Sequence, residues 1–169
     1  MTTASSFDSL SGADGPTEMF GECLGESQTQ SGVQALADLS KQARTRVEQS
    51  FEQVIEPTLS GVSKLDRIIQ GMWESEWAPN NASFNLFCTD FGALYAETFL
   101  SVSSLSPVFR SPSILNHMSF WQPGSRQEFF PFHKIAKALS SEHGESLAQM
   151  FKVAQQSAQS MAHPKGRAF

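Results

Sequence analysis

Residues 84–139 of this 169-residue chain hold its single Tyr, one of its two Cys and two of its four His, so a chemical motif is expected there. Asp90 and Glu97 are seven residues apart, so a helix would place both carboxylates on one face, about 10 Å apart along its axis. Paired carboxylates can perform acid–base chemistry, but this spacing favours separate roles. Asp90 fits a helix N-cap or first turn. For Glu97 we favour an ion pair with Arg110, and a binding role stays open.

A thiol nucleophile is the second chemical possibility, with Cys88 as the nucleophile and His117 or His133 as its base. No nucleophile signature surrounds Cys88, and a cysteine in an apolar helix is usually a buried small hydrophobe. The four histidines have no metal-ligand spacing, and the two cysteines form no Cys-x-x-Cys pair. No phosphate-binding Gly-rich loop follows a predicted strand. The sequence predicts no metal, no cofactor and no complete catalytic site.

A protein-recognition surface is the alternative that the residue types favour. Trp77 lies in an acidic polar loop, where an exposed indole can anchor a partner. Trp121 ends a predicted strand beside a turn. The predicted binding residues are Glu74, Glu76, Trp77, Glu97, Arg110 and Trp121. Because acidic and aromatic side chains combine here, the natural complement is another protein with a basic surface.

The charge of the chain is divided unevenly along the sequence. Residues 1–109 contain five Lys and Arg against fourteen Asp and Glu, whereas residues 110–169 contain seven against three. General nucleic-acid binding requires a coherent basic surface, so this distribution argues against it. The two halves could attract each other within one molecule or steer a partner, and both alternatives stay open. We expect a monomer or a weak homodimer.

The composition also predicts a cytoplasmic protein. The N-terminus has no basic region followed by an apolar run, and no window approaches the roughly 20 apolar residues of a membrane span. Cys23 and Cys88 cannot form a disulfide framework, so we expect two reduced thiols.

The hydrophobic periodicity divides the chain into a tail and one domain. Residues 1–31 are acidic and rich in Ser and Thr, which predicts a disordered tail with at most a short ordered piece near Met19 and Phe20. Residues 32–162 form the predicted domain. Its first helix runs from Gly32 to Ile55 with Ser31 as N-cap, and Pro57 separates it from a second helix at residues 58–73.

The second half of the domain combines strands with helices. A central third helix is predicted at residues 84–99, followed by strands at 107–110, 113–121 and 127–130. Pro131 suits the first position of a helix, and a last helix covers residues 144–161. Residues 163–169 should fray. The predicted fold class is α+β, with N-terminal helices, a small antiparallel sheet of about three strands, and C-terminal helices packed on it.

Part of this pattern resembles an uncharacterised bacterial domain family. The shared residues are Asp90, Gly92, Ala93, Tyr95 and Glu97, which correspond to a helix signature that reads roughly Asp-x-x-Gly-Ala-Tyr-x-Gly-Glu, and then Phe130-Pro131. Leu94 is inserted before Tyr95, and Ala96 stands where the signature has its second Gly. The resemblance covers about 70 residues. It implies an α+β fold and no established chemistry.

We interpret the sequence as a non-catalytic, protein-binding module: a small bacterial inhibitor, an immunity-like protein or an adaptor. One alternative is an effector or substrate of a secretion system, with residues 1–31 as its signal. The other is a hydrolase with a site near Glu97 and His117.

Overall fold

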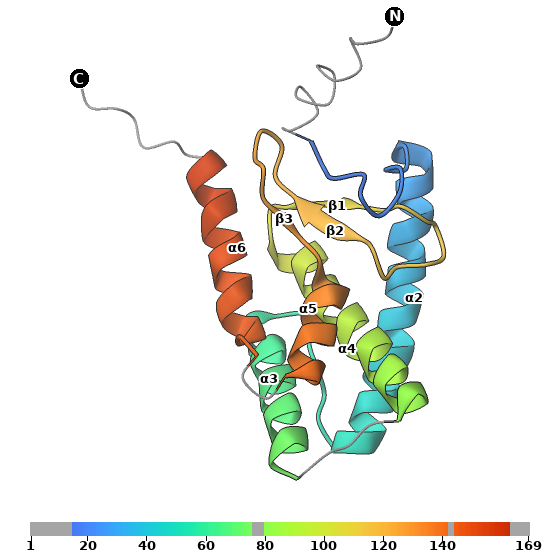
Figure 1. Cartoon of the computed structure of the whole chain (residues 1–169), viewed down its shortest axis with the longest axis vertical. Coiled ribbons are helices and arrows are strands. Elements are labelled where there is room, and N and C mark those ends of the chain that lie inside the picture. Colours follow the sequence, from blue (N-terminus) through green and yellow to red (C-terminus); the bar gives the residue numbers. More distant parts are fainter. Residues whose placement is uncertain (1–14, 76–79, 142–143, 163–169) are drawn as a thin grey trace, which may run out of the picture.

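The computed structural model describes residues 15–75, 80–141 and 144–162, with side chains as far as residue 159. Over these residues the chain forms five helices and one three-stranded antiparallel sheet, which confirms the predicted α+β class (Figure 1). The helices are α2 (Glu26–Phe51), α3 (Leu59–Glu74), α4 (Asn81–Val102), α5 (Pro131–Ser140) and α6 (Leu147–Ala162). The strands are β1 (Ser106–Val108), β2 (Ser119–Trp121) and β3 (Glu128–Phe129). No helix of the described ranges is long and apolar enough to cross a membrane.

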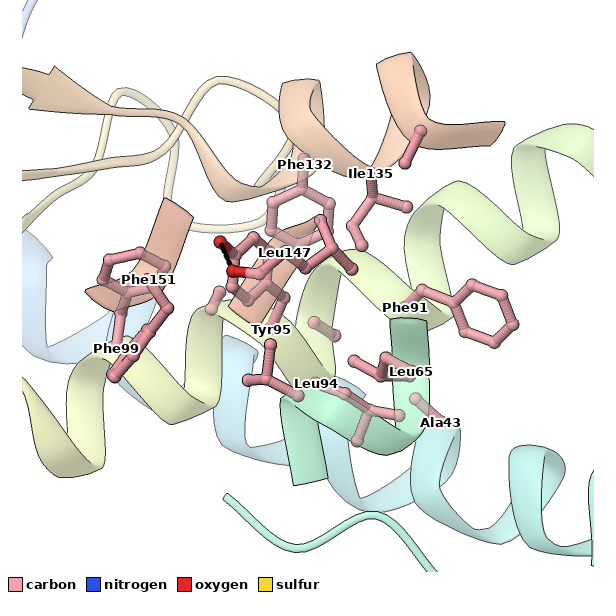
Figure 2. Packing of buried hydrophobic residues seen from close by; sticks show 14 of the residues in the cluster. Ala43, Leu65, Phe91, Leu94, Tyr95, Phe99, Phe132, Ile135, Leu147 and Phe151 are labelled. Atoms are coloured by element: carbon pink, nitrogen blue, oxygen red, sulfur yellow. Dashed lines mark hydrogen bonds between the residues drawn. The ribbon is translucent and has the colours of Figure 1, made fainter. Parts of the chain in front are cut away.

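Helix α4 lies at the centre of the molecule, as its dense apolar sequence predicts. Its residues 90–96 are all buried, and it packs against α2, α3 and α5. Figure 2 shows the Tyr95 side chain directed at Leu147 of α6, whose carbonyl oxygen accepts a 2.9 Å hydrogen bond from the phenol. This bond satisfies the one polar atom of a ring that is otherwise buried among apolar side chains.

The ends of the helices follow local capping chemistry. The Asn80 side chain accepts a 2.8 Å hydrogen bond from the Ser83 backbone N–H at the start of α4, and Thr58 does the same for Gly61 at the start of α3. Helix α2 ends at Phe51 because Glu52 adopts a left-handed conformation, with φ of 55°. It therefore stops before the predicted end at Ile55.

The sheet is smaller than the sequence pattern suggests. Pro107 pairs with Phe120, and Phe120 pairs with Phe129, in the order β1-β2-β3. The fully buried Phe120 ring stacks on Phe99 of α4 with centroids 5.1 Å apart, which fixes the sheet on the helical core. Residues 113–118, predicted as the start of the second strand, form a loop instead. Pro131 opens α5, which confirms that prediction.

An N-terminal strap, residues 15–25, lies against the sheet (Figure 1). The Leu24 backbone N–H donates a 2.8 Å hydrogen bond to the Phe109 carbonyl, and the Thr17 N–H donates one of 2.8 Å to Glu128. Helix α2 then begins at Glu26, without a side-chain cap, so Ser31 is an interior helical residue. The predicted disordered tail is therefore wrong for residues 15–31 apart from the short ordered piece expected near Met19 and Phe20, because the sheet supplies partners that local composition does not reveal. The rest of that prediction, residues 1–14, and the predicted frayed end, residues 163–169, lie outside the described residues.

Candidate functional site beneath the N-terminal strap

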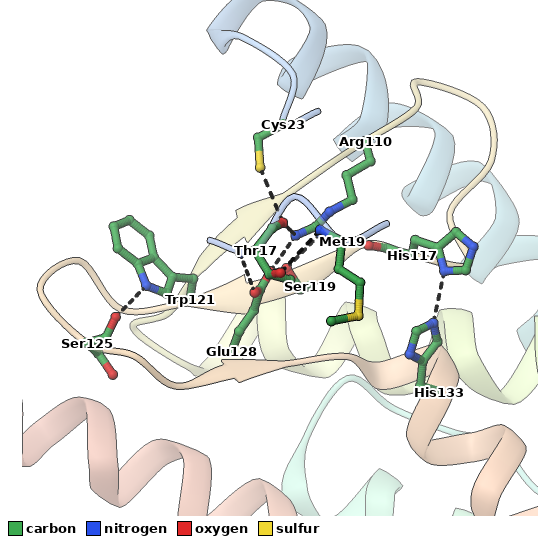
Figure 3. A network of polar contacts seen from close by, with 10 residues as sticks. All are labelled: Thr17, Met19, Cys23, Arg110, His117, Ser119, Trp121, Ser125, Glu128 and His133. Carbon is green, nitrogen blue, oxygen red and sulfur yellow. Dashed lines mark hydrogen bonds and ion pairs between the residues drawn. The ribbon is translucent and has the colours of Figure 1, made fainter. Parts of the chain in front are cut away.

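A buried arginine holds the strap to the sheet. Arg110 follows β1, and its side chain is 3% exposed, while that of its partner Glu128 on β3 is 9% exposed. The Arg110 guanidinium donates to Glu128 Oε1 at 2.6 Å, to the His117 carbonyl at 2.8 Å and to the Thr17 carbonyl of the strap (Figure 3). Ser119 accepts a further bond from Arg110 and donates to Glu128. One cation thus joins the strap, the loop after β1, and strands β2 and β3.

The predicted partner of Arg110 was Glu97, and this prediction is wrong. Glu97 on α4 pairs with Arg44 of α2, which also donates through Nε to the Ile55 carbonyl at 2.8 Å. The sequence could not rank the acids within reach of Arg110, since its actual partner, Glu128, belongs to a strand only two residues long.

Asp90 also has a role different from the predicted one. It lies nine positions beyond the first residue of α4 and is 3% exposed, so it is neither an N-cap nor a first-turn acid. Both of its carboxylate oxygens accept hydrogen bonds from Arg46 of α2, at 2.8 and 2.6 Å. The bidentate pair fastens α2 to α4, a structural role with specific geometry.

Next to Arg110, two histidines meet under an aromatic side chain of the strap. His117 Nδ1 and His133 Nε2 are 3.0 Å apart (Figure 3). The Phe20 ring stacks on His117, with centroids 4.9 Å apart and planes 8° apart, and meets His133 and Phe130 edge-on. Burial, together with the charges of His117 and Arg110, lowers the pKa of His133. Sequence reasoning noted each histidine, but nothing in the spacing indicated that they touch.

The structure does not assemble the predicted recognition surface into one patch. Trp121 is half-buried, and its indole N–H donates to the Ser125 carbonyl at 2.9 Å within the β2–β3 turn. Glu74 ends α3 at the opposite end of the molecule from the sheet and accepts a hydrogen bond from Gln70 (Figure 1). Glu76 and Trp77 lie outside the described residues. Of the predicted binding residues, Arg110 and Trp121 are the two that the sheet region holds.

The chain matches no protein-family model, and no similar sequence among curated proteins or similar solved structure was found. The resemblance through residues 90–97 therefore stays a prediction.

The possible metal ligands and the possible nucleophile Cys88 are the remaining chemical groups of the described residues. Within residues 15–75, 80–141 and 144–159, no three His, Cys, Asp or Glu side chains gather closely enough to hold a metal ion. Cys88 is half-buried against the hydrophobic core, less covered than the sequence predicted. Burial raises its pKa to about 11, which favours the protonated, unreactive thiol.

Cys88 should accordingly react slowly with alkylating reagents in the native protein. With a pKa of about 11 against an ordinary value of 9.0, its thiolate fraction at pH 8 is about 100-fold lower than that of a free thiol. Mass spectrometry after timed iodoacetamide treatment measures the rate, with urea-unfolded protein as the control. Equal rates in the native and unfolded states would contradict the proposed protection and would reopen Cys88 as a nucleophile.

Proposed function

We propose that this chain is a non-catalytic protein-binding module of the inhibitor, immunity-like or adaptor type, and that it acts in the cytoplasm. The observation that carries the proposal is the exposure of Met19 on a strap that is itself fixed. Met19 is 81% exposed, the highest value among the large apolar residues that the described surface exposes. Because the neighbouring Thr17 bonds to Glu128 of β3 and Phe20 packs on His117 of the β1–β2 loop, Met19 is presented by an ordered backbone.

An exposed, preorganised methionine suits a binding surface. Methionine is enriched in the cores of protein interfaces, and its flexible thioether adapts to irregular pockets. The conformational entropy of ordering the strap is already lost in the free protein. A partner that contacts Met19 therefore gains more net binding free energy than it would from a flexible tail.

The charges around Met19 indicate the chemistry of the partner. Glu18 and Glu22 flank it and are both exposed. Residues 15–40 contain four acids and no Lys or Arg. A basic surface with an apolar pocket is the complement of this arrangement, and such charge complementarity chiefly accelerates association.

The hydrolase alternative receives less support, because its residues contact different neighbours. Glu97 pairs with Arg44, His117 contacts His133, and Cys88 packs against the hydrophobic core. Cys88 and Glu97 are also nine residues apart on α4, which corresponds to about 13 Å along the helix axis. The polar groups that could have formed a catalytic site are used instead to join helices and strands. The cytoplasmic location rests on the free thiols of Cys23 and Cys88.

Affinity capture with matched variants tests this proposal. The immobilised full chain is exposed to a lysate of its source organism at low salt, and the retained proteins are identified by mass spectrometry. We expect a specific partner that is retained by the wild type and lost with Met19→Ala or with the charge reversals Glu18→Lys and Glu22→Lys. Val153→Ala is the control, since Val153 is an apolar residue of α6 that is 47% exposed.

Two results would contradict the proposed surface. One is a partner retained equally by the wild type and the strap variants, which would place the binding site elsewhere. The other is equal loss with the strap variants and with Val153→Ala, which would indicate nonspecific adsorption. Cross-linking from a photoreactive residue at position 19 confirms direct contact in the positive case.

A further inference from the structure

The strap is held by two sets of contacts that differ in chemistry. One is the Arg110–Glu128 pair, which binds both the N–H and the carbonyl of Thr17. The other is the aromatic contact of Phe20 with His117 and His133. Arginine keeps its charge throughout the accessible pH range, whereas histidine changes its charge near neutrality. Only the second set can therefore respond to a modest change in pH.

The hydrogen bond between His117 and His133 is compatible with only some protonation states of the two rings. His117 Nδ1 and His133 Nε2 face each other at 3.0 Å, a distance at which one nitrogen must donate and the other accept. Two neutral rings, or one neutral and one protonated ring, satisfy this requirement. When both rings are protonated, two N–H donors and two positive charges face each other. The hydrogen bond is then lost, and the rings must separate.

The surrounding charges do little to relieve that repulsion. Arg110 adds a fixed positive charge, since its guanidinium carbon lies 5.4 Å from the centre of the Phe130 ring and Phe130 in turn stacks on His133. Lys134, the residue after His133 on α5, is a further cation. The acids on the adjoining elements are Glu128, which is paired with Arg110, and Glu18 and Glu22 of the strap, which are exposed to solvent.

We propose that the His117–His133 pair is a pH-sensitive latch that holds the strap at neutral pH and releases its Phe20 end when both rings are protonated. Because Phe20 packs against both imidazoles, it cannot keep its position when they move apart. The latch is a property of the free protein. Its consequence, that acid would weaken partner binding at Met19, rests on the function proposed above.

The direction of the effect follows from the proton balance. The pKa of His133 is lowered from 6.5 in the closed state, so the open state binds more protons. The closed state is therefore unaffected well above pH 6.5. It loses stability relative to the open state as the pH falls from 6.5 towards the lowered pKa, and the loss is complete below that value.

Amide hydrogen exchange in the isolated full chain tests the latch without any partner. The reporters are the Leu24 N–H, bonded to the Phe109 carbonyl, and the Thr17 N–H, bonded to Glu128. NMR gives their protection factors at pH 7.5 and pH 5.0, corrected for the intrinsic pH dependence of exchange. We expect the protection of at least one reporter to fall by more than twofold at pH 5.0, because the open state binds more protons than the closed state. Amides in the middle of α4 should keep their protection.

His133→Gln is the matched variant, because the glutamine amide can still bond to His117 while one titrating ring is removed. In this variant the strap amides should be protected at pH 7.5, and their protection factors should change by less than about twofold at pH 5.0. His117→Asn serves the same purpose at an exposed position. The latch is refuted if wild-type protection is unchanged at pH 5.0, or if it falls equally in both variants. Because no partner is present, this outcome is separate from any failure of the proposed binding.

Discussion

Replacing Glu128 by Ala is expected to lower the free energy of unfolding by about 3–5 kcal/mol. The substitution leaves the Arg110 guanidinium, whose side chain is 3% exposed, without its anionic partner. One of its nitrogens, Nε, is already buried without a hydrogen-bond partner among the described residues, so little local compensation exists. Urea denaturation followed by tryptophan fluorescence measures the change in the unfolding midpoint and in its slope.

The Arg44–Glu97 ion pair between α2 and α4 provides the matched control. The Arg44 and Glu97 side chains are 27% and 22% exposed, so water can solvate Arg44 when its partner is removed. Glu97→Ala should therefore lower the free energy of unfolding by about 1 kcal/mol, the upper end for solvent-accessible pairs. A cost for Glu97→Ala equal to that of Glu128→Ala would contradict the argument from burial.

The double variant Arg110→Leu with Glu128→Leu separates an unpaired charge from lost packing. Replacing a buried ion pair by apolar residues of similar volume is often neutral, so the double variant should be more stable than Glu128→Ala. The strap should nevertheless exchange faster, because Thr17 has lost both of its partners. If the double variant is as unstable as the single one, the charge is not the cause of the loss.

The parts of the fold that the sequence predicts are those that local chemistry decides. Helix α3 begins after Thr58, the residue at which the prediction placed its start, because Pro57 stops the preceding segment and Thr58 caps the next. Pro131 opens α5 because its missing N–H is not needed in the first helical turn. In α4 the apolar surface extends around most of the helix, and this correctly predicted a central position.

The errors arise where a distant residue supplies the partner. Thr17 bonds to Glu128, 111 positions away, and Phe20 packs against rings from the β1–β2 loop and α5. Composition assigns residues 15–31 to a tail because it counts only the surface that a segment can bury with its own neighbours. The same limit explains why the partner of Arg110 was mistaken.

The candidate site was harder to predict than the fold for a related reason. The residue types alone made candidates of Arg110, His117 and His133. Their contacts, however, depend on how a short sheet packs against the start of α5. For Met19 the sequence predicted at most a short ordered piece, and nothing indicated that its side chain would be exposed on it. Its exposure became informative only when the strap around it proved to be fixed.

The close contact between α4 and α5 gives the second large expected effect. A Cβ added at Gly92 of α4 would lie 2.3 Å from a ring carbon of Phe132, which is 4% exposed and surrounded by the core. Neither group can move without opening the packing that seats α5 and, with it, His133. We expect Gly92→Ala to lower the free energy of unfolding by about 2–3 kcal/mol, even though alanine favours the helix itself by about 1 kcal/mol.

Gly71→Ala is the control for helix propensity. Gly71 lies on the exposed side of α3, and a Cβ there would have no neighbour within 4 Å. Gly71→Ala should raise the free energy of unfolding by up to about 1 kcal/mol, because alanine loses less conformational entropy than glycine on folding. Thermal and urea unfolding of the two variants therefore shift in opposite directions if α4 and α5 touch as described. A gain for Gly92→Ala similar to that of Gly71→Ala would show that the two helices are further apart, and the position of His133 beneath the strap would then need revision.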